Sequence, residues 1–430
     1  MKRRAFLKSV TAGLAMPCIV PRSVFGAAAK PAPNDRIAVG VIGCGGRVSA
    51  LLYEAPPQLQ VVALADCDLR QMSAESVFGK AVKSMPKYSQ QFATWKRYQD
   101  YSEMLEKEKL DAVFVTTTTH ARALACIHAV QAKKDVYAEK PLTLTIEEGQ
   151  VLVKAVRKHG RVLQVGTQCR TLPLYGWVNN LVRTGGLGRI EKVIAHNFEP
   201  PVRRESKPGQ PVPKELNWDM WCNQTPLVPY DPTELHPSCP LWGKWWEYDG
   251  GGLPWGMTGW GTHSLDMIQA ALGTDYTGPV EVWPDKPGDA LSPIFMRYAD
   301  GRRLEMTLPK GHGDFWGAIY HGEKGRIEFF LNKVQSDPPE LVAGHPEGTG
   351  YPALGHMHNW IDCMRTRKRP NADVEIAHRS STLCHLANIA RELGRRLRWN
   401  PDKEEFVGDA EANALKSRPR RKGYELPKIA

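Results

Sequence analysis

The feature that most constrains the fold is a series of short apolar runs separated by helical stretches between residues 36 and 166. Continuous apolar runs without alternation are typical of parallel strands that are buried on both faces of a sheet. Amphipathic stretches at 121–132 and 146–159 fit the helices that connect such strands. The sequence therefore predicts a doubly wound parallel sheet over residues 34–166, with strands at 37–42, 60–65, 111–115, 135–138 and 161–165.

The pattern of the chain changes after Gly166. Helical patterns are found at 172–183, 355–367 and 375–396. Between them, turns join strand-like segments, which predicts an antiparallel sheet with strands at 191–198, 291–299, 302–308, 316–321 and 325–330. We therefore expect a second α/β domain over residues 167–354, followed by a helical C-terminal region at 355–430.

The chain begins with the pattern of an export signal. Arg3 and Arg4 form a twin arginine, an apolar stretch follows from Val10 to Val20, and small residues occupy 26–29. This order is typical of a twin-arginine signal peptide, which we place at residues 1–29. Because the apolar stretch is too short for a stable membrane anchor, we expect a periplasmic or otherwise exported protein without a membrane segment in its mature form.

Charge and cysteine content exclude several classes of site. Loss of the five basic leader residues lowers the net charge from +11 to +6, which is too weak an excess to indicate nucleic-acid binding. The eight later cysteines show no CxxC spacing, and we expect free core thiols, with Cys222 and Cys239 as the one pair to test. His356 and His358 have no third ligand at a suitable spacing, so no metal site is expected.

A glycine-rich turn follows the first predicted strand. Gly43-Cys44-Gly45-Gly46-Arg47 opens a helix, so its backbone N–H groups can approach a pyrophosphate, although Val48 replaces the third glycine of Gly-x-Gly-x-x-Gly. Asp66 ends the second strand, where a carboxylate accepts hydrogen bonds from ribose hydroxyls and repels a 2′-phosphate. These residues predict NAD as the cofactor; NADP is less favoured, with Arg70 nearby as the argument for it.

Further motifs follow the glycine turn along the chain. They are Ala138-Glu139-Lys140-Pro141-Leu142-Thr143, Gly166-Thr167-Gln168-Cys169-Arg170, Gly261-Thr262-His263-Ser264-Leu265-Asp266, and two segments at 359–363 and 393–397. Together they resemble the glucose–fructose oxidoreductase, inositol dehydrogenase and MocA family (Gfo/Idh/MocA) over nearly the whole chain after the leader. The resemblance implies a Rossmann domain and an α/β domain with a large, open, mainly antiparallel sheet. It also implies a homo-oligomer, either dimer or tetramer, with the last helices packed back on the first domain.

The resemblance assigns roles to residues of these motifs. Lys140 would polarise the oxygen of a reacting hydroxyl, and His263 would take its proton. The family often has an Asp four residues before this His, where Gly259 stands here, so Asp249 or Asp266 are candidates to orient it. Cofactor contacts are expected from Gly43, Gly45, Gly46, Arg47, Asp66, His120, Glu139 and Gln168, and substrate contacts from Arg170, Trp260 and Asp266.

Seven tryptophans lie between residues 218 and 260. Aromatic faces stack on sugar rings, which suits the carbohydrate or cyclitol substrates that the resemblance implies. The same rings can instead fix a long loop or fill an interface, and both interpretations remain open.

Three functions are compatible with the sequence. The first is an oxidoreductase that transfers hydride between a sugar or cyclitol derivative and a tightly bound NAD(P). The second is redox-neutral cleavage of a glycoside, in which oxidation of a hydroxyl permits elimination before the hydride returns. The third is a non-catalytic sugar-binding protein, against which the retained Lys140 and His263 argue.

Overall fold

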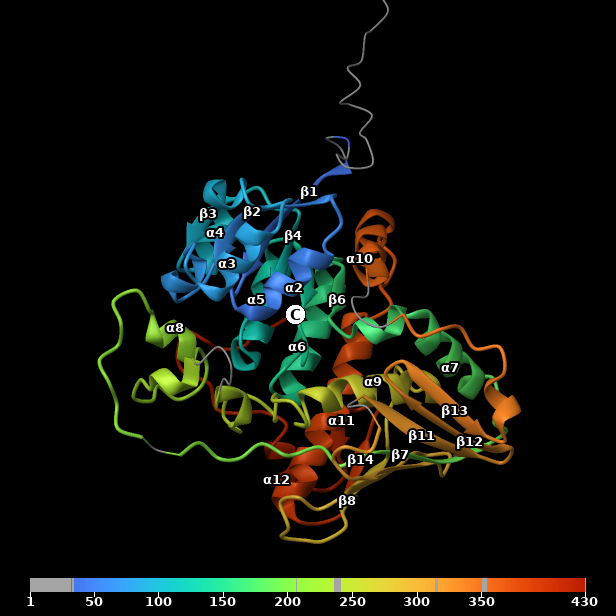
Figure 1. Cartoon of the computed structure of the whole chain (residues 1–430). Coiled ribbons are helices and arrows are strands. Elements are labelled where there is room, and N and C mark those ends of the chain that lie inside the picture. Colours follow the sequence, from blue (N-terminus) through green and yellow to red (C-terminus); the bar gives the residue numbers. More distant parts are fainter. Residues whose placement is uncertain are drawn as a thin grey trace, which may run out of the picture.

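Two sheets organise the computed structural model, which describes residues 32, 35–205, 207–235, 241–313, 316–349 and 354–429 (Figure 1). The expected signal peptide and Cys239 lie outside these described residues. Within them, all seven cysteines are free, and no helix is long and apolar enough to cross a membrane.

The first sheet has six parallel strands in the order β3-β2-β1-β4-β5-β6. The strands are β1 Ile37–Ile42, β2 Leu59–Ala65, β3 Lys96–Tyr98, β4 Ala112–Val115, β5 Asp135–Ala138 and β6 Leu163–Val165. The strand order reverses between β1 and β4, and ligands of such sheets bind beside the carboxyl ends of the strands at this point. The predicted doubly wound sheet is confirmed. The unpredicted β3 is a short edge strand whose Lys96 and Arg97 are exposed, so it lacks an apolar run.

The helices of this first domain are α2 Gly46–Glu54, α3 Val77–Ser84, α4 Tyr101–Lys107, α5 Thr119–Gln131 and α6 Ile146–His159. Helix α6 shows why the sequence places its ends well. Thr145 Oγ1 accepts a hydrogen bond from Glu148 N at 3.2 Å, and Gly160 ends the helix with φ +59°. Lys140 lies on the segment between the end of β5 and the start of α6.

The second sheet has nine strands in the order β13-β12-β11-β7-β10-β9-β8-β14-β15. Only the β7–β10 pair is parallel, so the predicted mainly antiparallel sheet is confirmed. The strands are β7 Ile190–His196, β8 Glu281–Pro284, β9 Ile294–Arg297, β10 Arg303–Leu308, β11 Gly317–Gly322, β12 Gly325–Phe330, β13 Lys333–Asp337, β14 Leu397–Asn400 and β15 Glu405–Phe406.

Three helices lie on one face of this sheet, α7 Pro173–Arg183, α9 Trp260–Leu272 and α11 Val374–Leu393 (Figure 1). Their buried residues form one core with the strands, through side chains such as Val178, Leu265 and Leu386 against Val193 and Leu304. Helix α9, which carries His263, thus packs on the sheet and against both α7 and α11.

Residues after 354 contact both domains. Helix α10, Leu354–Thr366, places the fully buried Trp360 against Phe114 and Tyr137 of the first sheet, with ring centroids 5.5 and 5.6 Å apart. After α12, Ala410–Ala414, the tail packs Leu426 and Ile429 on the core of the first domain. The chain therefore crosses between the two sheets again near its end.

Residues 197–259 form a long connection with a small core of its own. Its regular elements are α8, Trp218–Cys222, and two 3-10 helices, Pro232–Leu235 and Leu241–Lys244. Trp218 and Trp221 stack with centroids 4.5 Å apart, and Trp245 and Tyr248 complete the same buried cluster. These tryptophans fix the loop. Other short 3-10 helices are Leu69–Met72, Phe92–Thr94, Gln168–Thr171 and Pro339–Val342.

Candidate active site

The glycine turn between β1 and α2 leaves open space at the start of the helix. Gly43 has φ +90°, and a Cβ there would lie 2.7 Å from Thr117 N, so the protein itself requires glycine. A Cβ on Gly45 or Gly46 would meet nothing within 4 Å. The first turn of α2, whose N–H groups have no partner within the helix, begins at this space, which fits the pyrophosphate of a dinucleotide.

Asp66 lies beside this turn, at the end of β2. Its Oδ2 accepts a hydrogen bond from Cys44 N at 2.7 Å, and its Oδ1 accepts one from Asp68 N at 2.9 Å. Burial raises the pKa of Asp66 to about 6. Each oxygen keeps a lone pair for a ribose hydroxyl. Arg70 is held by Asp68 through bonds of 2.8 and 2.7 Å.

Glu139 connects the glycine turn with Lys140. Arg47 Nε donates to Glu139 Oε1 at 2.8 Å, and Lys140 N donates to Glu139 Oε2 at 3.1 Å. A Cβ on Gly166 would lie 2.8 Å from the same carboxylate, so glycine there makes room for it. Gln168 lies behind, where its Nε2 donates to Tyr137 Oη at 3.2 Å. Arg47 and Glu139 thus couple the start of α2 to the end of β5.

Lys140 and His263 meet at the start of α9. Lys140 Nζ donates to the carbonyl oxygen of Gly259, the N-cap residue of α9, at 3.2 Å. His263 follows one turn later, and its ring centroid is 4.4 Å from that of Trp316. Burial and the Lys140 cation lower the pKa of His263 well below its usual range, so its imidazole is neutral at pH 7. Burial also lowers the pKa of Lys140.

Gly259 cannot be replaced by Asp in this backbone. A Cβ at this position would lie 2.1 Å from Leu253 O. Asp249, one of the two alternative acids, is buried and accepts hydrogen bonds from Gly250 N at 2.6 Å and from the Thr119 and Thr258 hydroxyls. His263 Nδ1 has no hydrogen-bond partner in the described ranges, so neither Asp249 nor Asp266 orients it directly.

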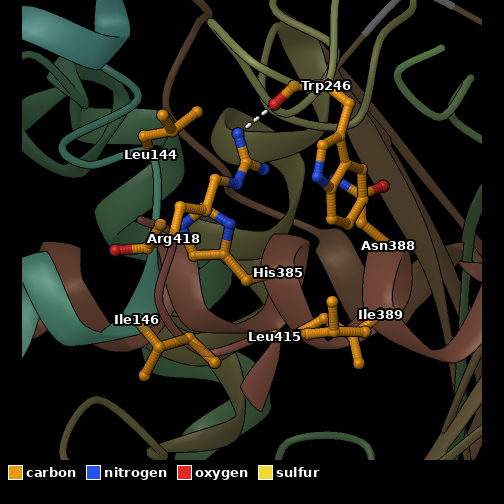
Figure 2. A pocket seen from close by; sticks show the side chains of 9 residues that line it. Leu144, Ile146, Trp246, His385, Asn388, Ile389, Leu415 and Arg418 are labelled. Carbon is orange, nitrogen blue, oxygen red and sulfur yellow. Dashed lines mark hydrogen bonds between the residues drawn. The ribbon is translucent and has the colours of Figure 1, made fainter. Parts of the chain in front are cut away.

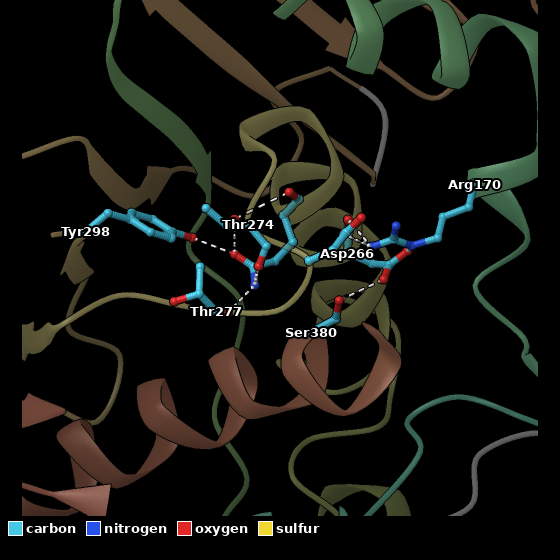
Figure 3. Close-up of polar contacts among 8 residues, drawn as sticks. Arg170, Asp266, Thr274, Thr277, Tyr298 and Ser380 are labelled. Atoms are coloured by element: carbon cyan, nitrogen blue, oxygen red, sulfur yellow. Dashed lines mark hydrogen bonds and ion pairs between the residues drawn. The ribbon is translucent and has the colours of Figure 1, made fainter. Parts of the chain in front are cut away.

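Arg170 and Asp266 bind one another in the interior (Figure 3). Arg170 Nε donates to Asp266 Oδ2 at 2.7 Å, and its Nη2 donates to Asp275 Oδ1 at 2.8 Å. Ser380 Oγ of α11 donates to Asp266 Oδ1 at 2.7 Å. The Arg170 and Asp266 side chains are 7% and 1% exposed. This geometry fixes α9 to α11 and to the segment after β6, and contact with a substrate stays a prediction.

His120 lies beneath the long connection formed by residues 197–259. It is fully buried, with its ring centroid 5.2 Å from Trp221 and 5.1 Å from Tyr248. Its Nε2 lies 2.7 Å from Trp221 O, and burial lowers its pKa to about 4. The structure therefore packs His120 of α5 against the long connection, and its contact with a cofactor stays a prediction.

A small cavity lies where α11, the loop and the tail meet (Figure 2). Its volume is about 10 Å³, and its lining includes Trp246, His385, Asn388 and Arg418. Arg418 lies over the Trp246 ring and donates to Trp246 O. The cavity has room for about one water molecule, so it is not the substrate site.

Both ring nitrogens of His356 lie within hydrogen-bond distance of protein atoms. Its Nδ1 lies 2.8 Å from Thr171 Oγ1 and its Nε2 lies 2.9 Å from Val165 O. Among the described residues, no three His, Cys, Asp or Glu side chains come together as a possible metal site.

Two parts of the site were not predicted from the sequence. Trp316 is distant from His263 along the chain and carries no motif, so only the fold brings it near. The Gly259 carbonyl that binds Lys140 is a backbone group, which a sequence motif does not reveal. The glycines of Asp249-Gly250-Gly251-Gly252 and Gly256 are the sequence signal that the backbone is closely packed around Gly259.

Two family profiles match the chain. "Oxidoreductase family, NAD-binding Rossmann fold" matches residues 37–167, and "Oxidoreductase family, C-terminal alpha/beta domain" matches residues 193–426. The uncharacterized oxidoreductase YrbE of Bacillus subtilis is 28% identical over 173 residues, which are 39% of this chain and 47% of that protein. Inositol 2-dehydrogenase of Salmonella typhimurium is 27% identical over 157 residues, which are 36% of this chain and 44% of that enzyme.

The match thus spans less than half the length of these two relatives. The fold is similar to that of the WlbA dehydrogenase of Bordetella pertussis, solved with NADH and UDP-GlcNAcA. Its TM-score is 0.59 at 18% identity, and the match covers 85% of this chain and 99% of that one. Because the two profiles together span both domains, the chain belongs to the Gfo/Idh/MocA oxidoreductase family, with an NAD-binding Rossmann domain followed by the family's C-terminal α/β domain.

Proposed function

We propose that this protein is an NAD-dependent oxidoreductase that acts on a hydroxyl group of a sugar or cyclitol derivative. The carrying observation is the meeting of Lys140 and His263 at the start of α9, beside the carboxyl end of β5. The named activities of the inositol 2-dehydrogenase relative and the WlbA structure support this substrate class. Asp66 supports NAD over NADP, because its carboxylate would repel a 2′-phosphate, while Arg70 is neutralised by Asp68.

The two side chains divide the work at one hydroxyl. A nicotinamide ring, when bound, supplies the acceptor or donor of hydride. Lys140 donates a hydrogen bond to the hydroxyl oxygen and stabilises the negative charge that develops on it. His263, whose lowered pKa keeps it neutral, takes the hydroxyl proton as the carbonyl forms and returns it in the reverse direction.

We further propose that the chain is exported by its twin-arginine leader as a folded protein that already holds its cofactor. Free NAD is scarce outside the cytoplasm, so the cofactor would have to remain bound and be restored in place. This requirement favours a reaction after which the bound cofactor has returned to its starting oxidation state, either hydride transfer between two sugars or the redox-neutral cleavage of a glycoside.

The first test is the content of the protein purified after native export. Denaturation followed by mass and absorbance measurement of the released molecules is expected to give stoichiometric NAD or NADH. Absence of nucleotide, together with no binding of added NAD or NADP, would contradict the proposed function.

The second test uses variants of the reacting pair. We expect Lys140→Met and His263→Asn each to lower turnover by roughly 10²- to 10⁴-fold while NAD still binds. The exposed Lys154→Met and His358→Asn are matched controls and should keep full turnover. Release of nitrophenol from nitrophenyl glycosides without a second sugar would identify cleavage, and carbonyl formation in one sugar with reduction of another would identify transfer.

A further inference from the structure

Six of the seven tryptophans at 218–260 fall into two groups, and the seventh, Trp242, is partly exposed and packs on the buried cluster of the long connection. Trp218, Trp221, Trp245 and Trp246 are 2–7% exposed and fix the loop. Trp255 and Trp260 are partly exposed and meet edge to face, with ring centroids 5.0 Å apart. Trp260 is the first residue of α9 and lies three positions before His263, so both side chains occupy the same side of the helix. Trp260 thus lies on the same side of α9 as the reacting group, and Trp255 packs on Trp260.

The backbone at Trp255 is held in an unfavourable conformation. Its φ is +65°, a region that bulky side chains rarely adopt. Glu199 N donates to Trp255 O at 2.8 Å, and Met257 N donates to Glu199 O at 2.8 Å, so β-like bonds on both sides keep the turn in place. The Trp255 ring packs edge to face on His196, with centroids 5.2 Å apart, and stays partly exposed. Strained residues of this kind cluster at ligand-binding sites.

A charged pair borders the Trp255 ring. Lys310 Nζ lies 5.7 Å from the Trp255 ring centroid and donates to Glu199 Oε1 at 3.2 Å. Both side chains are more than half exposed, so their remaining donors and acceptors are accessible. An aromatic face beside accessible polar groups matches a sugar ring, which presents a C–H face and a rim of hydroxyls.

We propose that Trp255 and Trp260 form a subsite for a second sugar ring, next to the ring that reacts at His263. The preferred substrate is then a glycoside or an oligosaccharide rather than a free monosaccharide. This inference rests on the proposed function. It adds that the substrate has at least two rings and that Trp255 and Trp260 bind the second one.

The test compares binding of short and extended ligands to the NAD-loaded protein by calorimetry. The probes are methyl glycosides of common hexoses and the corresponding disaccharides and nitrophenyl glycosides. The wild type is expected to bind the extended ligand of one hexose roughly tenfold more tightly than its methyl glycoside, since one further ring is buried against an aromatic face. Trp255→Gly should reduce this preference to about twofold or less.

Trp255→Gly also separates binding from folding. Glycine accepts a positive φ, so relief of the backbone strain offsets part of the ring contacts that are lost, and a cooperative melting transition well above the assay temperature shows that the variant folds. Trp283, a partly exposed tryptophan of β8 stacked on Phe295, supplies the control variant Trp283→Leu, which should keep the preference. An unchanged preference in Trp255→Gly would overturn the subsite.

The outcomes also distinguish the subsite from the function on which it rests. Turnover of methyl glycosides by the wild type, with no gain for any extended ligand, overturns the subsite and leaves the proposed function standing. Binding of neither ligand class by the NAD-loaded wild type overturns both.

Discussion

Replacement of Arg170 by Met tests whether this residue holds the second domain together. The variant keeps most of the aliphatic stem but removes the guanidinium, so Asp266, 1% exposed, keeps its charge with only Ser380 as a hydrogen-bond donor. Asp275, 23% exposed, loses its partner as well. Breaking one side of a buried ion pair typically costs about 3–5 kcal/mol. For a cooperative unit of about 250–400 residues, this corresponds to a fall in melting temperature of roughly 4–10 °C.

The assay is thermal unfolding by circular dichroism, with sugar and NAD affinity measured well below the transition. Arg189→Met is the matched control, because Arg189 pairs with Glu323 at 3.2 Å while the two side chains are 72% and 51% exposed. An exposed pair contributes about 0–1 kcal/mol, so this control should unfold close to the wild type. Addition of Asp266→Asn to Arg170→Met should restore part of the loss, because it removes the unpaired charge.

The opposite pattern would refute this reasoning. If Arg170→Met unfolds within about 1 °C of the wild type but raises KM for the sugar at least tenfold, Arg170 belongs to the substrate site. The ion pair with Asp266 would then be replaceable by solvent, and the role predicted from the sequence motif would stand.

Two further predictions concern the cofactor site. Gly45→Val should keep the melting temperature of the wild type but bind NAD at least tenfold more weakly, because the new side chain enters the open space before α2. Gly43→Val should unfold at a lower temperature, because its Cβ would meet Thr117. The pKa of Asp66 is raised to about 6, so its charge is lost as the pH falls from 8 to 5, and calorimetry should show NADP gaining on NAD over this range. The 2′-phosphate of NADP also titrates in this range and contributes to the change in both proteins. Asp66→Asn should therefore show a smaller change in the NADP-to-NAD affinity ratio than the wild type, and equal pH profiles for both proteins would contradict the role of Asp66.

The first domain was predicted in more detail than the second. Its strands β1 and β4, and β5 after Asp135, are short apolar runs, and such runs indicate strands that are buried on both faces. Strand β13, with the sequence Lys333-Val-Gln-Ser-Asp337, lies at the edge of the second sheet and alternates between exposed and partly exposed residues. It therefore lacks the apolar pattern from which a strand is predicted.

The site shows the same division between local and distant information. The Gly43 turn and Asp66 lie within one strand–helix–strand unit, so local spacing predicts their meeting. Arg170 and Asp266 are 96 positions apart, and each lies in a motif that suggested substrate contact. Only tertiary structure shows that the two side chains satisfy each other. The positive φ of Trp255 depends in the same way on its bonds with Glu199.

The place of β7 in the second sheet has a consequence for the kinetics of folding. This strand lies between β10 and β11, both of which come much later in the chain, and residues 197–280 separate it from the next strand, β8. Those residues carry the aromatic loop, Trp255 and the whole of α9 with His263. Closing so long a connection is entropically costly before any strand pairing compensates for it. The centre of the second sheet and the site around His263 should consequently form in one slow, cooperative step. Substitutions in residues 197–259 should therefore alter the refolding rate as well as the turnover.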